Sequence, residues 1–395
     1  MWKAINDLNE FFEPQEKFDR LMSATFRQFG PNVVDLSYAN AYEGPDEQVL
    51  RALELSIRED KELSFQYTPY GGRTTTRRLV ASKLIQEYKL PFNYRDIILT
   101  PGAMAALNIV FRTLFGPEDE VVVLTPCWLD YPLYLGNLGI PIRFVALNED
   151  KHFDLTLIRE ALRAKTRGIL FSHPSCPSGV LYPKEEIDGL SGLLVEAEKR
   201  FGTRIYLISD EVHRHIIWSG DPFYSPLLSY PRALSIYSFG KALFLQGQRI
   251  GYVAVSPQMP ENRKIRGHLE RCVRMMGFCT PTNLMQRAIC RLLDYQPCLD
   301  RIARLQETVR VELEKYGYEV CRGEATFFVY VKSPLLDDFE FAEFLASHGV
   351  LVTPSTLFHE RGYFRISVAA RPESIMRALP VFEKVLEKVT AQDHA

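Results

Sequence analysis

The stretch 238–252 reads Ser238-Phe-Gly-Lys241-Ala-Leu-Phe-Leu-Gln-Gly247-Gln-Arg249-Ile-Gly251-Tyr252 and follows the apolar run 234–237. Lys241 stands between apolar segments, where an ordinary ammonium loses its hydration, whereas a lysine condensed with a carbonyl as a Schiff base carries no isolated charge. The Ser238 hydroxyl and the Arg249 guanidinium have a spacing that lets them converge on one phosphate while Lys241 reaches an aldehyde. The stretch therefore predicts a site for a phosphate group and an imine-forming lysine.

Short apolar runs upstream of this stretch predict the rest of the sheet. Between residues 46 and 290 such runs alternate with helix-like stretches, as in strands that a mostly parallel sheet buries on both faces. Ligands bind beyond the carboxyl ends of such strands, so the residues that follow each run are the candidates for chemistry. The five runs are 97–99, 121–124, 168–171, 205–208 and 234–237, followed by 100–104, 125–128, 172–176, 209–213 and 238–241.

The pattern changes beyond residue 290. Apolar residues from Leu299 to Tyr316 recur at steps of three and four and stop at Gly317, which predicts an amphipathic helix with a glycine C-cap. Strand-like segments at 327–331, 350–352 and 363–367 precede a closing helix that ends near Val389. We therefore expect a large α/β domain over 46–288 and a smaller α+β unit formed by 1–45 and 289–395.

Composition excludes several classes of protein. The chain of 395 residues has 47 Lys and Arg against 49 Asp and Glu, so it lacks the basic excess of a nucleic-acid-binding protein. No apolar run reaches the 18 residues of a membrane span. Seven cysteines without a Cys-x-x-Cys pair argue against a disulfide framework and against a zinc ribbon. We expect a cytoplasmic protein with no metal site.

With these motifs the chain resembles the class I/II aminotransferases, which are pyridoxal-5′-phosphate (PLP) enzymes of fold type I. The resemblance extends over about residues 30 to 390 and implies the aspartate-aminotransferase-like α/β fold with PLP as cofactor. It implies that Lys241 forms the internal aldimine with PLP. It also implies that Asp210 pairs with the protonated pyridine nitrogen and keeps the ring an electron sink.

The resemblance assigns further residues by their place in the motifs. Those expected to bind the cofactor are Gly102, Ala103, Met104, Ser238 and Arg249 at the phosphate, and Trp128 on the face of the ring. Tyr67 matches the tyrosine that reaches the phosphate of a neighbouring subunit, which implies a symmetric homodimer. Arg365 matches the arginine that binds the α-carboxylate of an amino-acid substrate.

Each of these residues also has a structural interpretation. Trp128 is equally compatible with core packing, Tyr67 with a surface turn, and Ser238 and Asp210 with caps at strand ends. Arg365 is compatible with an edge-strand charge paired with Glu360 or another acid.

Two positions depart from the family pattern. Cys176 stands where the family has an asparagine that donates a hydrogen bond to the phenolic oxygen of the cofactor, and His213 stands where it usually has a tyrosine that donates to the same oxygen. A thiol is a weak donor, although a small buried cysteine with no chemical role is the alternative for Cys176. The sequence Asp210-Glu-Val-His213 also resembles the cystathionine β-lyase-like C–S lyases, which usually lack the arginine found here at 249.

These motifs predict a PLP-dependent aminotransferase that acts on an amino acid. The alternatives are a PLP-dependent C–S lyase or a cyclising enzyme and, last, a binding protein that keeps the fold, although such a descendant has no need of Lys241. The sequence does not identify the substrate or decide between transamination and elimination. The residues expected to line the substrate pocket are Tyr38, Ala39, Asn40, Tyr70 and Phe278.

Overall fold

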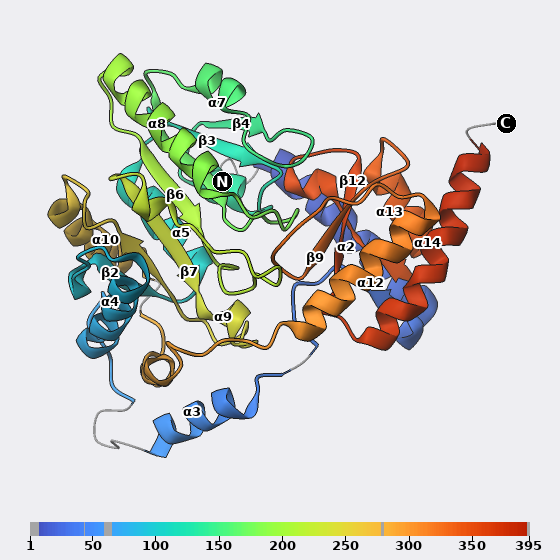
Figure 1. The fold of residues 1–395 in the computed structure, drawn as a ribbon, viewed down its shortest axis with the longest axis horizontal. Coiled ribbons are helices and arrows are strands. Elements are labelled where there is room, and N and C mark those ends of the chain that lie inside the picture. Colours follow the sequence, from blue (N-terminus) through green and yellow to red (C-terminus); the bar gives the residue numbers. More distant parts are fainter. Residues whose placement is uncertain (1–7, 43, 59–64, 278–279, 393–395) are drawn as a thin grey trace.

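A seven-stranded sheet forms the centre of the computed structural model, which describes residues 8–42, 44–58, 65–277 and 280–392 (Figure 1). Within the described residues of this sheet, β8 runs antiparallel to both of its neighbours, β2 and β7. The other neighbours run parallel. Across the sheet the strands are β2 (Ile97–Thr100), β8 (Gly251–Val255), β7 (Ala233–Ser238), β6 (Tyr206–Asp210), β5 (Thr166–Ser172), β3 (Glu120–Thr125) and β4 (Ile142–Ala146).

Both faces of this sheet are buried because apolar side chains occupy both sides of the pleat. Ile97 and Leu99 of β2 belong to one hydrophobic cluster, and Ile98 between them belongs to the other. Helices α4 (Thr74–Tyr88) and α8 (Lys184–Phe201) cover the first face. Helices α5 (Ala103–Leu114), α6 (Tyr131–Asn137) and α10 (Asn262–Met276) cover the second.

A smaller α+β part has its own core. Strands β11 (Thr353–Pro354), β12 (Tyr363–Ser367) and β9 (Phe328–Lys332) form an antiparallel sheet with β12 in the middle. The N-terminal segment joins this part, since β1 (Val34–Asp35) pairs in parallel with β10 (Val350–Leu351). In Figure 1 the blue α2 accordingly lies among the orange and red helices. These helices are α2 (Asn9–Phe29), α12 (Asp300–Tyr316), α13 (Asp338–Ala346) and α14 (Pro372–Gln392).

Short helices complete the fold. The α-helices are α3 (Glu47–Arg58), α7 (Leu155–Ala161), α9 (Phe239–Ala242) and α11 (Asn283–Ala288). The 3₁₀ turns are η1 (Gly30–Asn32), η2 (Tyr94–Asp96), η3 (Pro226–Leu228), η4 (Ile289–Arg291) and η5 (Ser355–Phe358).

The expected sheet is confirmed, and the sequence pattern missed two of its strands. All five apolar runs form strands, and Gly317 ends α12 in the left-handed region at φ 107°. The missed β4 has partly exposed residues at an edge of the sheet, and β8 begins inside the motif at 238–252. The proposed division at residue 288 remains a prediction.

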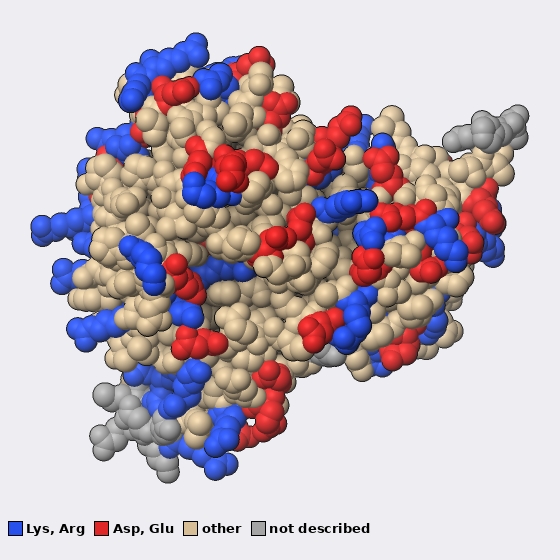
Figure 2. Space-filling model, viewed as in Figure 1, with Lys and Arg blue, Asp and Glu red and all other residues tan. Residues whose placement is uncertain are grey.

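The surface carries charges of both signs. Across most of the face drawn in Figure 2 acidic and basic side chains are interspersed, and several Lys and Arg side chains gather along its left edge, beside α10. Within the described residues no helix combines the length and the apolar character that crossing a bilayer requires.

Candidate active site

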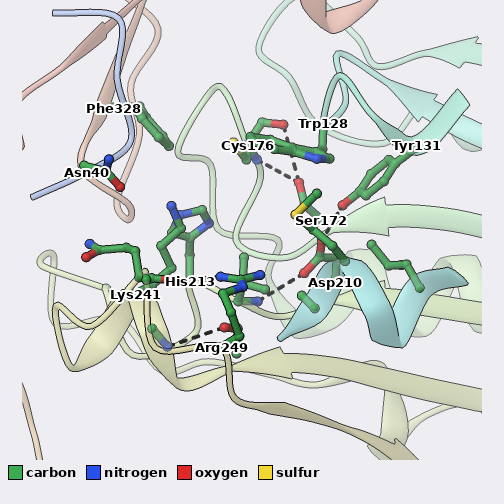
Figure 3. A pocket seen from close by; sticks show the side chains of 18 residues that line it. Asn40, Trp128, Tyr131, Ser172, Cys176, Asp210, His213, Lys241, Arg249 and Phe328 are labelled. Carbon is green, nitrogen blue, oxygen red and sulfur yellow. Dashed lines mark hydrogen bonds between the residues drawn. The ribbon is translucent and has the colours of Figure 1, made fainter. Parts of the chain in front are cut away.

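A cavity of about 370 Å³ opens at the carboxyl ends of the central strands, where the sequence predicted the chemistry (Figure 3). Its wall brings together residues from both parts of the molecule. The lining residues are Asn40, Ala103, Met104, Leu107, Trp128, Tyr131, Ser172, Cys176, Asp210, Val212, His213, Ser238, Gly240, Lys241, Gln246, Gly247, Arg249 and Phe328.

Lys241 lies in α9, the short helix that begins directly after β7. The Ser238 hydroxyl caps this helix by accepting the backbone N–H of Gly240 at 3.4 Å. The Lys241 ammonium donates to the carbonyl of Ala39 at 3.4 Å. Burial lowers its pKa to about 8, because an ammonium out of water loses hydration. A larger fraction of the amine is therefore uncharged and nucleophilic near neutral pH than for an exposed lysine.

Asp210 is the last residue of β6 and is buried at the bottom of the cavity. The Tyr131 hydroxyl donates to its Oδ2 at 2.7 Å, and the backbone N–H of Val212 donates to its Oδ1 at 3.3 Å. Burial raises the pKa of the Asp210 carboxyl to about 6 in spite of these donors. A cation placed beside this carboxylate would offset that burial cost.

The N-terminus of α5 and the Arg249 guanidinium meet at Gly102. Gly102 caps α5 with φ 84°, a conformation that glycine adopts readily, and a Cβ on it would lie 2.5 Å from Arg249 Nη2. The guanidinium therefore lies against the N-terminal turn of α5. The backbone N–H groups in the first turn of a helix have no carbonyl partner within the helix. A helix N-terminus with an arginine beside it binds an anion such as a phosphate.

His213 and Cys176 both line the cavity and are buried. Among the described residues neither ring nitrogen of His213 has a hydrogen-bond partner. Burial, followed by the charges of Lys241 and Arg365, holds its pKa well below the usual value, so its imidazole is neutral. Burial raises the pKa of the Cys176 thiol, which lies 4.0 Å from Arg365 Nη1.

Arg365 lies on β12 behind Cys176 and Phe328, and it is 3% exposed. Its guanidinium lies 4.0 Å from the Phe328 ring and 4.7 Å from the Phe358 ring, and its Nη2 donates to Ser37 O at 3.0 Å. Within the described part of the chain its buried Nε has no partner. The edge-strand alternative is wrong, because β12 is the middle strand. Glu360 pairs instead with Lys151.

The model of the family described as "Aminotransferase class I and II" matches residues 31–380. The chain belongs to this family. The family uses pyridoxal 5′-phosphate, so the protein is a PLP-dependent aminotransferase.

Relatives of this aminotransferase cover most of its length. It is 29% identical over 346 residues to a probable aspartate aminotransferase of Methanocaldococcus jannaschii, covering 86% of this chain and 89% of that one. It is 27% identical over 372 residues to an aspartate/prephenate aminotransferase of Thermus thermophilus, covering 91% and 92%. The solved structure of an aminotransferase from Eubacterium rectale superimposes with a TM-score of 0.90 at 27% identity, covering 94% and 95% of the two chains.

The remaining predicted site residues of the aminotransferase lie in different places. Trp128 and Asn40 line the cavity, as do Ala103 and Met104. Tyr38 is 59% exposed and does not line it. Tyr67 is fully exposed and lines a separate hollow together with Gln248, the neighbour of Arg249. Phe278 lies outside the described residues.

Several lining residues of the aminotransferase were missed by the sequence reasoning. Tyr131 lies three residues after Trp128 and holds Asp210, whereas Ser172 ends β5 and falls within the predicted segment 172–176, in which it was given no role of its own. Tyr131 follows a strand already singled out, so attention to every polar group beyond that strand would have found it. Phe328 begins β9 in the other part of the molecule, and no local pattern connects it with the cavity.

Proposed function

We propose that this aminotransferase holds PLP in the cavity described above and transfers the amino group of an amino acid with Lys241 as its catalytic residue. The observation that carries the proposal is that the half-buried Lys241, just beyond β7, and the buried Asp210, at the end of the neighbouring β6, line the same cavity. When bound, PLP supplies an aldehyde and an electron-withdrawing ring that ease the loss of a proton from the α carbon of the substrate.

The residues present fit this cofactor. The buried Asp210 carboxylate suits a protonated ring nitrogen, and Tyr131 holds it in place. The cradle of Gly102, Arg249 and the N-terminus of α5 suits a phosphate. The unpartnered nitrogens of His213 offer one donor and one acceptor to a molecule in the cavity.

Lys241 is suited to both roles that the reaction requires of its amine, which are nucleophile and base. Its uncharged amine is a nucleophile toward an aldehyde, and the same amine accepts a proton from carbon when it is released. Its burial keeps the pKa near 8, so both protonation states are populated under ordinary conditions.

The substrate proposal rests on Arg365. Its planar guanidinium, held between the rings of Phe328 and Phe358, has a free Nε donor next to the cavity wall. A carboxylate accepts two parallel hydrogen bonds from such a group. We propose that Arg365 binds the α-carboxylate of the amino acid and that Asn40 lies near its side chain. The relatives are named as aspartate and aspartate/prephenate aminotransferases, which makes aspartate and prephenate the first candidate substrates to test.

A second candidate function is elimination of a leaving group from the β carbon. His213, which is shared with the C–S lyase motif, lies in the cavity next to the charge of Lys241. The same proton removal from the α carbon then ends in loss of the leaving group.

One experiment tests both candidates. The holoenzyme is incubated with each standard amino acid, with cystathionine and with prephenate plus an amino donor, and the products and the cofactor spectrum are followed. Transamination gives a keto acid and the aminated cofactor, whereas elimination at the β carbon releases the leaving group, which is homocysteine for cystathionine, together with pyruvate and ammonia. Elimination products without any aminated cofactor would overturn the aminotransferase assignment for the tested substrate.

The role of Lys241 is tested on the same holoenzyme. Borohydride should attach the cofactor irreversibly, and a peptide map should place it on Lys241. Lys241→Ala should lower turnover by at least about a thousandfold, since one amine serves as nucleophile and as base. Attachment to any other lysine would contradict the assignment.

We also propose a homodimer that works in the cytoplasm. Exposed aromatic side chains gather near the separate hollow, with Phe65 68% exposed and Tyr67 fully exposed, and apolar surface of this kind marks interfaces. The six described cysteines are unpaired, as is usual where thiols are kept reduced.

A further inference from the structure

A largely buried ion pair joins the loop after β4 of the large sheet to the segment just before β12, the strand that carries Arg365. Lys151, which is 2% exposed, donates from Nζ to Glu360 Oε1 at 2.8 Å. Its Nζ also lies 3.9 Å from the centre of the Tyr363 ring. The second oxygen of Glu360 accepts the Tyr330 hydroxyl at 2.6 Å. These four side chains are called here the Lys151 cluster. Within it the ammonium faces a carboxylate and an aromatic ring, and each oxygen of the carboxylate accepts a hydrogen bond.

The cluster connects two parts of the molecule that are far apart in sequence. Lys151 lies in the loop between β4 and α7 of the large sheet, whereas Glu360 follows η5, 209 positions later. Tyr330 on β9 is the cross-strand partner of Arg365, and Tyr363 stands two residues before Arg365 on β12. The side chains of Tyr330, Tyr363 and Arg365 therefore share one face of the small sheet.

The backbone at Lys151 adopts a conformation that is uncommon for a lysine. Lys151 has φ 65°, in the left-handed region that favours glycine. The turn is held by the Lys151 N–H, which donates to the Asn148 carbonyl at 3.0 Å. A glycine would satisfy this turn with less strain, but it would leave the Glu360 carboxylate without its cation.

Neighbouring contacts bring the same segment close to Arg365. The backbone N–H of Cys127, beside Trp128 of the cavity wall, donates to Phe358 O at 3.0 Å. The ring of His359 stacks on Phe144 of β4 at 4.8 Å. Phe358 itself lies against the Arg365 guanidinium. The segment 358–360 is thus held to the large sheet at three consecutive residues, one of which flanks the arginine.

We infer that Lys151 is a positioning residue for the substrate: its ion pair with Glu360 holds the small sheet against the large one and thereby holds Arg365 next to the cavity. The inference rests on the proposed role of Arg365 as the carboxylate-binding residue. A buried ammonium is tolerated only with a well-placed partner, so the pair permits one relative position of the two parts. Lys151 itself touches neither substrate nor cofactor.

The test compares Lys151→Met with Glu360→Gln and with a matched control, Lys332→Met. Lys332 lies on β9 of the same sheet, and its pair with Glu319 is also 2.8 Å long but exposed. Lys151→Met should raise the KM for the amino acid that the wild type turns over fastest by about tenfold to a hundredfold, with kcat and the affinity for PLP nearly unchanged. Glu360→Gln should do the same, and the control should not.

Hydrogen–deuterium exchange provides a readout that does not depend on turnover. In Lys151→Met, without substrate, the amides of 355–361 and of β12 should exchange faster than in the wild type and in Lys332→Met. If the wild type transaminates none of the amino acids, the proposed function fails, and the exchange result alone decides whether the ion pair holds β12. If Lys151→Met does not fold, Glu360→Gln decides. A fall in kcat with unchanged KM, or unchanged exchange, would overturn the inference.

Discussion

At the scale of single residues, Asp210 shows a conflict between stability and function. Its ordinary pKa of 3.8 rises to about 6 in the folded apoprotein, so the folded state binds a proton that the unfolded state has lost between these values. Stability therefore falls as pH rises from about 4 to about 6 and stays lower above that. The shift of roughly two units corresponds to about 3 kcal/mol.

Asp210→Asn should consequently stabilise the apoprotein while abolishing activity. At pH 8 the free energy of unfolding should rise by up to about 3 kcal/mol, and near pH 4 the difference should vanish because the wild-type carboxyl is then protonated. Urea unfolding of both apoproteins at the two pH values measures this. A stability difference that does not depend on pH would show that the charge of Asp210 is not its cause.

The second residue-scale prediction concerns Cys176. Its thiol is held protonated by burial and is a weak donor, whereas an amide in its place would stabilise negative charge on the phenolic oxygen of the cofactor. Cys176→Asn should therefore lower the pH at which the visible absorbance of the holoenzyme changes. A shift of one pH unit in this midpoint corresponds to about 1.4 kcal/mol. Coincident spectral titrations of wild type and variant would place the thiol out of contact with the cofactor.

At the scale of elements, the turn from β2 into α5 depends on Gly102. A methyl group there would meet Arg249 and would also require a left-handed backbone. Gly102→Ala should weaken the binding of PLP and of inorganic phosphate by about tenfold or more, because the guanidinium must leave the helix N-terminus.

A matched control lies at the other end of α5. A Cβ on Gly116 would have its nearest contact at 3.9 Å, from Asp119, so Gly116→Ala should leave phosphate affinity unchanged. Fluorescence titration with both ligands measures the difference. Equal affinities for the Gly102 and Gly116 variants would remove this turn from the proposed phosphate site.

At the scale of the whole molecule, we predict a symmetric homodimer in which Tyr67 completes the site of the neighbouring subunit. Tyr67→Ala should lower PLP affinity by about tenfold, the value of one hydrogen bond to a charged group. Leu336→Ala, which removes another exposed apolar side chain, is the control. Sedimentation should show a dimer for all three proteins, and a fully active monomer would contradict the prediction.

Much of the site is visible in the sequence because local spacing carries it. Lys241, Ser238 and Arg249 lie within twelve consecutive residues, and Asp210 and Cys176 lie in the short segments that follow apolar runs. In a parallel sheet the ends of such runs meet at one edge, so strand order alone brings these side chains together. The cavity residues of the smaller part cannot be found from local spacing, because Phe328 and Asn40 reach the cavity only where the smaller core packs against the large sheet.

The sequence by itself determined the α/β architecture and the placement of Lys241, Asp210 and Arg249 beside the strand ends, because hydrophobic period and short-range spacing are properties of neighbouring residues. Only the tertiary structure decided which side chains contact and position these functional residues. Tyr131 meets Asp210 across 79 positions, Lys151 meets Glu360 across 209, and Phe328 and Phe358 enclose the guanidinium of Arg365. Such pairs form where separate apolar faces pack together, and the fit between packed faces leaves no periodic trace along the chain.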